Sequence, residues 1–377
     1  MPNENIKYEL KNYWRDIDKK ILFSFIILFL LGLFFSFSST SSLAGERLNK
    51  DYYFFFYKHL FFMFLAMGIM FCFSFIKLQF LKKSIIPLFI FFLILLFLVP
   101  MIGVEVKGSK RWLDLFFFRL QPIELIKPFF ILITALILTS ENIKKSNSTY
   151  ILSFLILISL ILLLINQPDI GQTILIVTSW IAVIFVSGIN ILIAISIFLI
   201  FLILLSFILY IFPEKFGYII LRLKTFYDPK IGDSFQTDKA LEAIKLGGLK
   251  GQGMGEGILK DNVPEAHTDY IIAVVSEEFG SLISISIIIL FLYIAFRIIK
   301  ICLRQKNDEI KISLCGLSAM LIFQTFIHIG VNTSLIPTTG MTLPFLSYGG
   351  SSLIGSSFLA GIILNYTKNR ASQLTYE

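Results

Sequence analysis

Charged residues are scarce in this chain of 377 residues: 15% are aspartate, glutamate, lysine or arginine, whereas 56% are hydrophobic. An ordinary soluble domain is about one-quarter charged and no more than about half apolar. The charges that are present gather between long apolar runs. This scarcity excludes an ordinary soluble domain, and the distribution predicts a protein that crosses a membrane several times.

Cysteine and histidine are also rare, with three of each. An odd number of widely spaced cysteines predicts neither a disulfide framework nor a cysteine metal site. The histidines are too scattered to suggest a metal site, so we assign none. The net charge is +8, but the basic residues flank apolar runs. We therefore attribute the excess to membrane orientation and expect no nucleic-acid partner.

Long apolar runs are what the chain has in abundance. A helix needs about 17 to 25 apolar residues to cross a bilayer, and ten segments reach or approach that length. We predict an all-α polytopic membrane protein with ten transmembrane helices. The predicted spans are Ile21–Thr40, Leu60–Ile76, Ile85–Ile102, Ile123–Thr139, Tyr150–Ile165, Gly171–Ser187, Ile189–Phe212, Asp269–Phe296, Ile312–Ile336 and Leu343–Tyr366.

The basic residues predict the orientation of these spans. An even number of crossings places both termini on one side of the membrane. Lysines and arginines beside the spans are concentrated on that side, which the positive-inside rule assigns to the cytoplasm. The predicted organisation is a cytoplasmic tail (1–20), helices 1–7 (21–212), a large periplasmic loop between helices 7 and 8 (213–268), helices 8–10 (269–367) and a second cytoplasmic tail (368–377).

The large outer loop leads into the first residue that could carry chemistry. A loop of this length is usually functional or disordered. Its last residues include Glu265 and His267, and the eighth predicted span begins at Asp269. A charge at the membrane boundary is costly without a partner or a water-filled cavity. Two interpretations of Asp269 stay open and can coexist: a helix cap or a functional carboxylate.

Four charged residues fall inside predicted spans: Glu124 and Lys127 in the fourth, and Glu277 and Glu278 in the eighth. Intramembrane acids normally face the interior of a helix bundle and pair with a cation. We expect Lys127 to be the partner of Glu277 and Glu278. A structural ion pair is favoured over catalysis for these residues.

Other residues with binding chemistry lie in loops on the outer side. Lys110 and Arg111 precede the fourth span and form either a solvated loop or a phosphate-binding pair. Asp169 follows a proline and is expected to cap the sixth span in a tight turn. The segment 335–352 mixes helix breakers with small polar residues, including Ser347 and Tyr348. Such breaks are tolerated in a bilayer only against protein or a water-filled cavity.

The segment 246–257 is dense in glycine. It does not follow a predicted strand and lacks the Gly-Lys-Ser/Thr ending of a nucleotide-binding loop, so nucleotide binding is not expected. We interpret it as a flexible or backbone-binding loop. The alternative is that its N–H groups line a phosphate or sugar site.

Taken together, these motifs resemble the SEDS family, named for shape, elongation, division and sporulation. The order and spacing of the strings, and the number of spans, match the family along the whole chain. Two departures are Ile123, where the family usually has serine, and Thr339, where lysine is frequent. The matching strings are Gly108–Trp112, Gln121–Lys127, Gln167–Gly171, Pro264–Tyr270 with Glu277–Gly280, and Thr342–Ser352.

Within the family, the strings at 264–269 and 337–345 are more similar to the division branch than to the elongation branch. The resemblance implies a peptidoglycan glycosyltransferase that polymerises lipid II, the undecaprenyl-pyrophosphate-linked disaccharide peptide. It also implies a multi-pass protein of the bacterial inner membrane at the division septum. The implied partners are a class B penicillin-binding transpeptidase and other divisome membrane proteins.

The family's essential aspartate falls on Asp269. A carboxylate there can accept the proton of the attacking sugar hydroxyl. The pyrophosphate is a good leaving group, so cations can replace the second carboxyl of a glycosidase. Mg²⁺ or Mn²⁺ is the cofactor that could share this charge. The residues expected to contact the substrate are Lys110, Arg111, Arg222, Lys224, Glu265, His267, Ser347 and Tyr348.

Alternatives from other functional classes remain. Ten spans with intramembrane charges also suit a lipid II flippase, but a transporter should hold its decisive charges near the midplane. Asp269 at the outer boundary favours surface chemistry. A non-catalytic scaffold that recruits the transpeptidase and an elongation-type polymerase are the other two alternatives.

Overall fold

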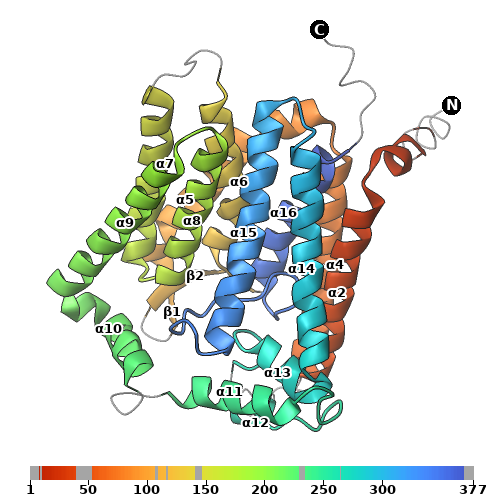
Figure 1. Cartoon of the computed structure of the whole chain (residues 1–377), viewed down its shortest axis with the longest axis vertical. Coiled ribbons are helices and arrows are strands. Elements are labelled where there is room, and N and C mark those ends of the chain that lie inside the picture. The colour runs from red at the N-terminus through yellow and green to blue at the C-terminus, as the bar shows by residue number, and fades with distance from the viewer. Residues whose placement is uncertain are drawn as a thin grey trace.

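The structure is a computed structural model (Figure 1), and it describes residues 8, 11–39, 53–106, 109–115, 118–140, 147–228, 234–263 and 265–368. Two residues of the matching strings, Gly108 and Pro264, lie outside these ranges. So do parts of both predicted cytoplasmic tails.

Helices occupy all ten predicted ranges, and the all-helical membrane fold is confirmed. Six of the helices are long and apolar enough to cross a membrane. These are α2 (Lys19–Ser38), α4 (Phe54–Phe75), α5 (Leu78–Ile102), α7 (Asn147–Asn166), α14 (Ser281–Cys302) and α15 (Asp308–Asn332). The other four helices in these ranges are α6 (Pro122–Leu138), α8 (Ile170–Val186), α9 (Ile191–Ile211) and α16 (Gly350–Tyr366).

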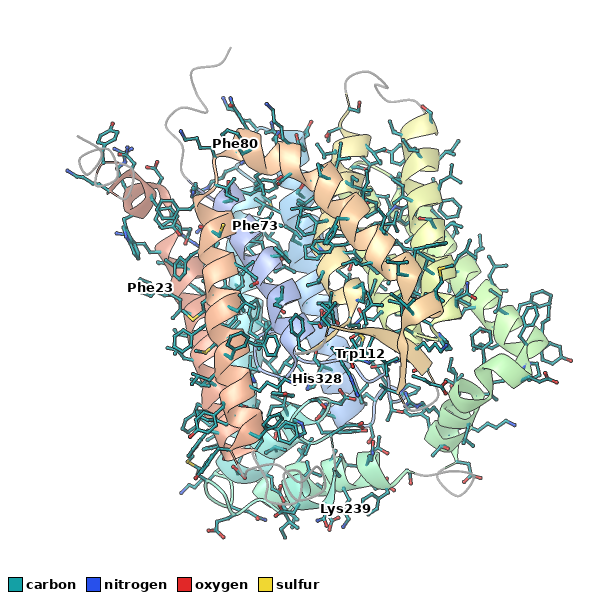
Figure 2. All side chains as sticks on the ribbon, turned by 180° about the vertical axis from the view of Figure 1, so that it is seen from behind. Phe23, Phe73, Phe80, Trp112, Lys239 and His328 are labelled. Atoms are coloured by element: carbon teal, nitrogen blue, oxygen red, sulfur yellow. The ribbon has the colours of Figure 1, made fainter. Side chains whose placement is uncertain are left out.

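Helices α6 and α16 form the centre of the bundle. Every residue of α16 from Ser351 to Tyr366 is buried, as is α6 from Pro122 to Ala135. The two helices approach closely because Gly355 faces the Glu124 carbonyl, where an added Cβ would lie 2.3 Å from the oxygen. Small residues at such crossings are typical of membrane helices. Aromatic side chains point outward at the periphery, as Phe23 and Phe80 show in Figure 2.

The described part of the predicted periplasmic loop is largely helical. It contains α10 (Pro213–Tyr227), α11 (Phe235–Gly247) and α12 (Leu259–Asn262). These helices lie at the lower end of the bundle in Figure 1, whereas α2 begins at the opposite end. An ion pair between Asp18 and Arg297 joins the start of α2 to the far end of α14, with 2.8 Å between Nη2 and Oδ2. We call the end that carries α10–α12 the outer end, after the predicted orientation.

The predicted eighth span is wrong as a single helix. The chain breaks at Gly280, which has φ +86°, into α13 (Ile271–Phe279) and α14. A left-handed glycine allows the turn, and the Ser281 N–H then donates to the Gly248 carbonyl at 2.9 Å. An added Cβ at Gly280 would lie 2.2 Å from the Leu249 carbonyl oxygen. The break makes α13 a separate helix at the outer end of α14.

The glycine-dense segment binds the backbone of α13. The Gln252 and Gly253 N–H groups donate to the carbonyls of Glu277 and Glu278, at 2.9 and 3.0 Å. At Gly247 an ideal Cβ would lie only 1.9 Å from the Ser276 carbonyl oxygen. Glycine is therefore needed for this approach, and the Gln252 and Gly253 N–H groups serve the fold rather than a phosphate.

We expect Gly247→Ala to destabilise the protein. The added methyl group would overlap the Ser276 carbonyl, and overpacking of this kind costs about 1–3 kcal/mol. The matched control is Gly68→Ala in α4, where nothing lies within 4 Å of an added Cβ. Thermal unfolding in detergent should show a lower midpoint for Gly247→Ala only. Equal midpoints for the two variants would contradict the close packing of this segment.

A small antiparallel sheet replaces the loop expected before the fourth span. It consists of β1 (Val104–Val106), β2 (Ser109–Asp114) and β3 (Arg119–Leu120), in the order β1-β2-β3. Val104 pairs with Trp112 and Asp114 pairs with Arg119. The two β-branched valines favour a strand, but the run is too short to be distinguished from a loop by sequence. The sheet sets the positions of two arginines described below.

Candidate active site

Asp269 lies on a tight turn that precedes α13. The Glu265 carbonyl accepts the N–H groups of Thr268 and Asp269, at 3.1 and 3.0 Å. Helix α13 has Tyr270 as its N-cap residue, with no side-chain cap hydrogen bond. Asp269 therefore stands one residue before the cap position.

The backbone of this turn is held from one side by Asn332 of α15. Its amide group donates to the Asp269 carbonyl at 3.0 Å and to the His328 carbonyl at 2.8 Å. Its oxygen accepts the Ala273 N–H at 3.2 Å. Asn332 is fully buried. The sequence analysis missed this residue because a single asparagine in an apolar helix gives no signal of what it binds.

The segment between α15 and α16 holds the turn from the other side. The Ser347 hydroxyl donates to the Thr268 carbonyl at 2.6 Å and accepts the Leu343 N–H at 2.8 Å. The Tyr348 N–H donates to the His267 carbonyl at 3.0 Å. The structure thus brings Ser347, Tyr348 and His267 together. Ser347 is buried and its described bonds are to backbone, so it positions the turn rather than contacting a substrate.

The Asp269 carboxylate faces Gly340. An added Cβ at Gly340 would lie 3.5 Å from Asp269 Oδ2, and Gly340 has φ +70°. Arg222 of α10 reaches the same segment, where its guanidinium donates to the Thr338 carbonyl at 3.2 Å. Asp269 and Arg222 both act electrostatically on the Tyr270 hydroxyl. The structure therefore places an exposed arginine on the segment that faces the carboxylate.

The Arg111 guanidinium contacts protein groups, so it is not fully available to bind a phosphate. Its guanidinium donates to the carbonyls of Gln167 and Pro168 and lies 3.8 Å from Asp169 Oδ1. Burial raises the pKa of the Asp169 carboxyl, with Arg111 and the Gln172 N–H acting against that rise. Asp169 also caps α8 by accepting the Gln172 N–H at 3.4 Å. The tight capped turn predicted here is present.

The turn at Asp169 adjoins the segment over Asp269. Gly171, at the start of α8, lies against Thr339 and Met341, where an added Cβ would be 2.9 Å from the Thr339 Cβ. Lys110 on β2 and Lys224 on α10 are exposed on the same outer end. The residues on this side of the turn are therefore basic and partly accessible.

A second pair of cations lies near the start of α4. Lys58 is half-buried and Arg119 of β3 is exposed, and the two act on each other electrostatically. Within the described ranges neither forms an ion pair with a carboxylate. Like charges held close together without an acid favour an anionic ligand. The sequence analysis missed this pair because the two residues are 61 positions apart.

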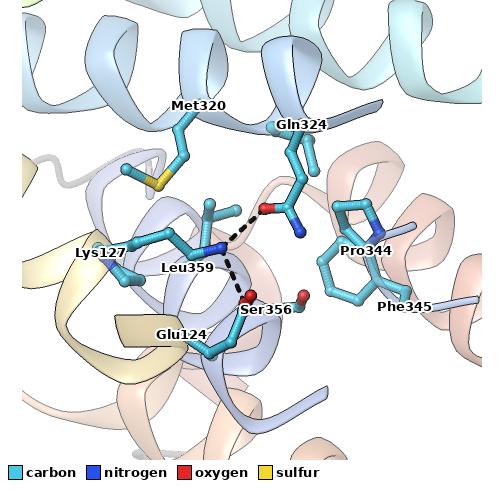
Figure 3. A pocket seen from close by; sticks show the side chains of 11 residues that line it. Glu124, Lys127, Met320, Gln324, Pro344, Phe345, Ser356 and Leu359 are labelled. Carbon is cyan, nitrogen blue, oxygen red and sulfur yellow. Dashed lines mark hydrogen bonds and ion pairs between the residues drawn. The ribbon is translucent and has the colours of Figure 1, made fainter. Parts of the chain in front are cut away.

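A buried polar network runs from the outer end into the bundle (Figure 3). Lys127 Nζ lies 2.8 Å from Glu124 Oε2 and 3.1 Å from Gln324 Oε1. The Gln172 amide donates to Glu124 Oε1 at 2.6 Å. Gln324 in turn donates to the Thr342 carbonyl at 3.1 Å. A small pocket adjoins the pair.

Lys127 is not the partner of Glu277 and Glu278, so that expectation is corrected. Glu277 accepts the N–H groups of Ile258 and Leu259, both at 3.0 Å. Glu278 accepts the Ser38 hydroxyl. The break at Gly280 places both glutamates at the outer end of α14, away from the bundle centre. Glu277 holds the start of α12, and Glu278 contacts α2.

His267 is electrically neutral near physiological pH, because burial lowers the pKa of its imidazole to about 4. It therefore contributes a ring and a hydrogen-bonding group rather than a charge. Among the described residues, no three histidine, cysteine, aspartate or glutamate side chains gather as a metal site. Mg²⁺ or Mn²⁺ would have to take most of its ligands from substrate and water, as Mg²⁺ often does.

The chain is similar to known proteins along most of its length. The model of the FtsW/RodA/SpoVE family, described as a cell cycle protein, matches residues 19–372. The chain is 30% identical over 358 residues to the probable peptidoglycan glycosyltransferase FtsW of Caulobacter vibrioides, covering 95% of this chain and 91% of the relative. It is 33% identical over 358 residues to the protein of the same name from Geobacter sp., covering 92% and 96%.

Solved structures share the fold. A chain from a peptidoglycan synthase complex that coordinates polymerization and crosslinking superposes with a TM-score of 0.75 at 24% identity, covering 93% of this chain and 97% of that one. The rod shape determining protein RodA of Thermus thermophilus superposes with a TM-score of 0.68 at 24% identity, covering 93% and 96%.

Proposed function

Because the chain belongs to the FtsW/RodA/SpoVE family of cell cycle proteins, we propose that it is a peptidoglycan glycosyltransferase that polymerises lipid II. The observation that carries the proposal is the Asp269 carboxylate. It lies on a turn fixed between Asn332 and Ser347, and Arg222 contacts the segment that faces it. A carboxylate held in this way can act as a general base.

The reaction forms one bond and breaks another. The acceptor's sugar hydroxyl loses its proton to Asp269 as its oxygen bonds to the anomeric carbon of the donor. The bond between that carbon and the pyrophosphate oxygen breaks, and the polyprenyl pyrophosphate leaves with the electron pair. The product is a glycan lengthened by one glycosidic bond, and the proton on Asp269 passes to water.

Cations take the place of a second carboxyl group. A glycosidase protonates its leaving oxygen with an acid, whereas a pyrophosphate needs only its developing charge stabilised. Arg222 is placed to do so beside Asp269, and Lys58 with Arg119 offers a second anion site. The exposed Lys110 and Lys224, and Glu265 at the turn, are assigned to outer contacts with the substrate.

Surface chemistry requires the α10–α13 end to face the outside of the cell. We assign ten spans to α2, α4–α9 and α14–α16, with 213–268 in the periplasm and both termini in the cytoplasm. The surplus of lysine and arginine at the opposite end supports this orientation. Arg297 and Lys300, at the inner end of α14, belong to that surplus.

Cysteine labelling tests the orientation. In a variant without the native cysteines, Lys250→Cys should react with a membrane-impermeant maleimide in intact spheroplasts, because Lys250 is exposed on the outer end. The matched control, Lys306→Cys, is exposed between α14 and α15 and should react only after lysis. The reverse pattern would place the proposed site in the cytoplasm and remove it from lipid II on the outer leaflet.

We further propose that the protein acts at the division septum with a class B penicillin-binding transpeptidase and other divisome proteins. The curated relatives are named FtsW, and a structural relative is part of a complex that coordinates polymerization and crosslinking. Depletion should give filaments, whereas round cells would indicate elongation instead.

The direct test is polymerisation in proteoliposomes. The purified protein with its transpeptidase partner should convert lipid II into glycan strands that are resolved on a gel. Lipid II that moves between leaflets without forming strands would indicate a flippase. Neither movement nor strands, with intact binding of the partner, would indicate a scaffold.

A further inference from the structure

Three partly exposed aromatic rings meet beside the proposed site. The ring centroids of Phe55 and His267 lie 5.1 Å apart, those of His267 and Tyr348 lie 5.4 Å apart, and those of Phe55 and Tyr348 lie 5.5 Å apart. The interplanar angles are 43°, 58° and 89°, so no two of the rings are stacked face to face. Part of their surface is therefore left open at the outer end.

These rings come from three separate elements. Phe55 is in the first turn of α4, His267 is on the turn before Asp269, and Tyr348 precedes α16. The hydrogen bond from the Tyr348 N–H to the His267 carbonyl fixes two of them relative to each other. The cluster is thus tied to the turn that carries the proposed general base.

A cation lies next to the rings. Lys58 is three residues after Phe55 on α4, which places the two on one face of the helix. Arg119 acts on Lys58 from the sheet. A patch with an aromatic part and a cationic part therefore adjoins the turn that carries Asp269.

A buried imidazole lies beneath the patch. His59 is fully buried, and its ring centroid is 6.0 Å from that of Tyr348. Neither ring nitrogen has a hydrogen-bond partner among the described residues. Buried polar groups are normally satisfied, so an unpartnered ring here points to a group that the described residues do not supply.

The ligand chemistry follows from these parts. An aromatic ring carries negative charge on its face, and the C–H groups on the flat side of a pyranose carry slight positive charge. Sugar rings therefore stack on aromatic side chains, while a pyrophosphate suits lysine and arginine. In lipid II these two chemical groups are directly linked, so a ligand of this kind matches the patch in both composition and order.

We propose that Phe55, His267 and Tyr348 form a carbohydrate-stacking platform that binds the sugar ring next to the pyrophosphate held by Lys58 and Arg119. The proposal rests on the proposed function and names the substrate group that this part of the site recognises. His59 lies buried below the platform and supplies a hydrogen bond to a water that accompanies the sugar. The platform selects lipids that carry a sugar over lipids that end in a bare pyrophosphate.

Binding of two lipids tests the platform separately from catalysis. The probes are undecaprenyl pyrophosphate and the same lipid carrying the disaccharide peptide, each titrated against the full-length protein in nanodiscs. We expect Phe55→Leu to weaken binding of the sugar-carrying lipid by about three- to tenfold, the scale of an aromatic contact. Binding of undecaprenyl pyrophosphate should not change.

Three further variants distinguish loss of the platform from general damage to the fold. Phe55→Tyr retains the ring and should restore binding of the sugar-carrying lipid. Phe61→Leu, at an exposed position one to two turns further along α4, should change neither affinity. Lys58→Gln should weaken the binding of both lipids. Equal affinities of Phe55→Leu and the wild type for the sugar-carrying lipid, with unchanged thermal unfolding, would overturn the platform. That outcome would leave the proposed function to be judged by glycan synthesis.

Discussion

Replacing Asp269 with asparagine should reduce glycan polymerisation by about 100-fold or more, the scale of a lost general base. Asparagine has nearly the same shape as aspartate but cannot accept the proton of the attacking hydroxyl. The backbone contacts of the turn, from Asn332 to the Asp269 carbonyl and from Ser347 to the Thr268 carbonyl, do not use the carboxylate. Folding should therefore persist, and initial rates of strand formation from lipid II give the measurement.

Two controls belong with this variant. Asp269→Glu moves the carboxylate by about one methylene and should retain little activity, because catalysis depends on positioning. Glu265→Gln changes a neighbouring acid on the same turn and should have a smaller effect. Near-normal polymerisation by a well-folded Asp269→Asn would remove Asp269 from the mechanism. Loss of folding in that variant would instead assign the carboxylate a structural role.

Replacing Lys127 with methionine should lower the stability of the protein by about 3–5 kcal/mol, the cost of leaving one member of a buried ion pair uncompensated. Lys127 is 3% exposed and Glu124 is 4% exposed, so neither charge can be solvated after its partner is lost. Thermal unfolding in detergent and the yield of folded protein measure the effect. Both should fall.

The double variant Glu124→Gln with Lys127→Met separates charge from packing. It leaves no uncompensated charge, so much of the lost stability should return, since neutral replacement of a buried pair is often tolerated. A Lys127→Met protein with full stability and no activity would contradict the structural role. Lys127 would then have to act on the substrate.

The parts of the fold that sequence predicts well are those set by long apolar runs. Helices α2, α5 and α15 are each 20 residues or longer, and such lengths leave little alternative in a bilayer. The break at Gly280 could not be predicted in the same way. It depends on the Gly248 and Leu249 carbonyls, which approach from a loop about thirty residues earlier.

Sequence also predicted some residues of the candidate site and missed others. Asp269, His267 and Tyr348 were identified from strings of residues that resemble a known family, and the structure does bring them together. Lys58 and Asn332 were missed because their importance lies in contacts between distant segments. Arg119 acts on Lys58 from β3, a strand of a sheet that the sequence did not reveal.

The expectation for Glu277 and Glu278 failed for a physical reason. Hydropathy placed them inside a span, where an acid needs a cation. In the structure backbone N–H groups and a hydroxyl satisfy these carboxylates instead. A carboxylate that accepts two backbone N–H bonds needs no ion pair, and sequence alone does not show which donors a loop will supply.

Photocrosslinking with lipid II tests the central claim most directly, because it reports where the reacting part of the substrate binds. A lipid II analogue with a photoreactive group beside its pyrophosphate would be bound to the wild-type protein and to Asp269→Asn, and crosslinked peptides identified by mass spectrometry. We predict crosslinks in both proteins at the outer end, in the segments 55–58, 265–270 and 337–348. Crosslinks confined to the pocket beside Glu124 and Lys127, with none at the outer end, would contradict a polymerase site at Asp269 and favour transport through the bundle.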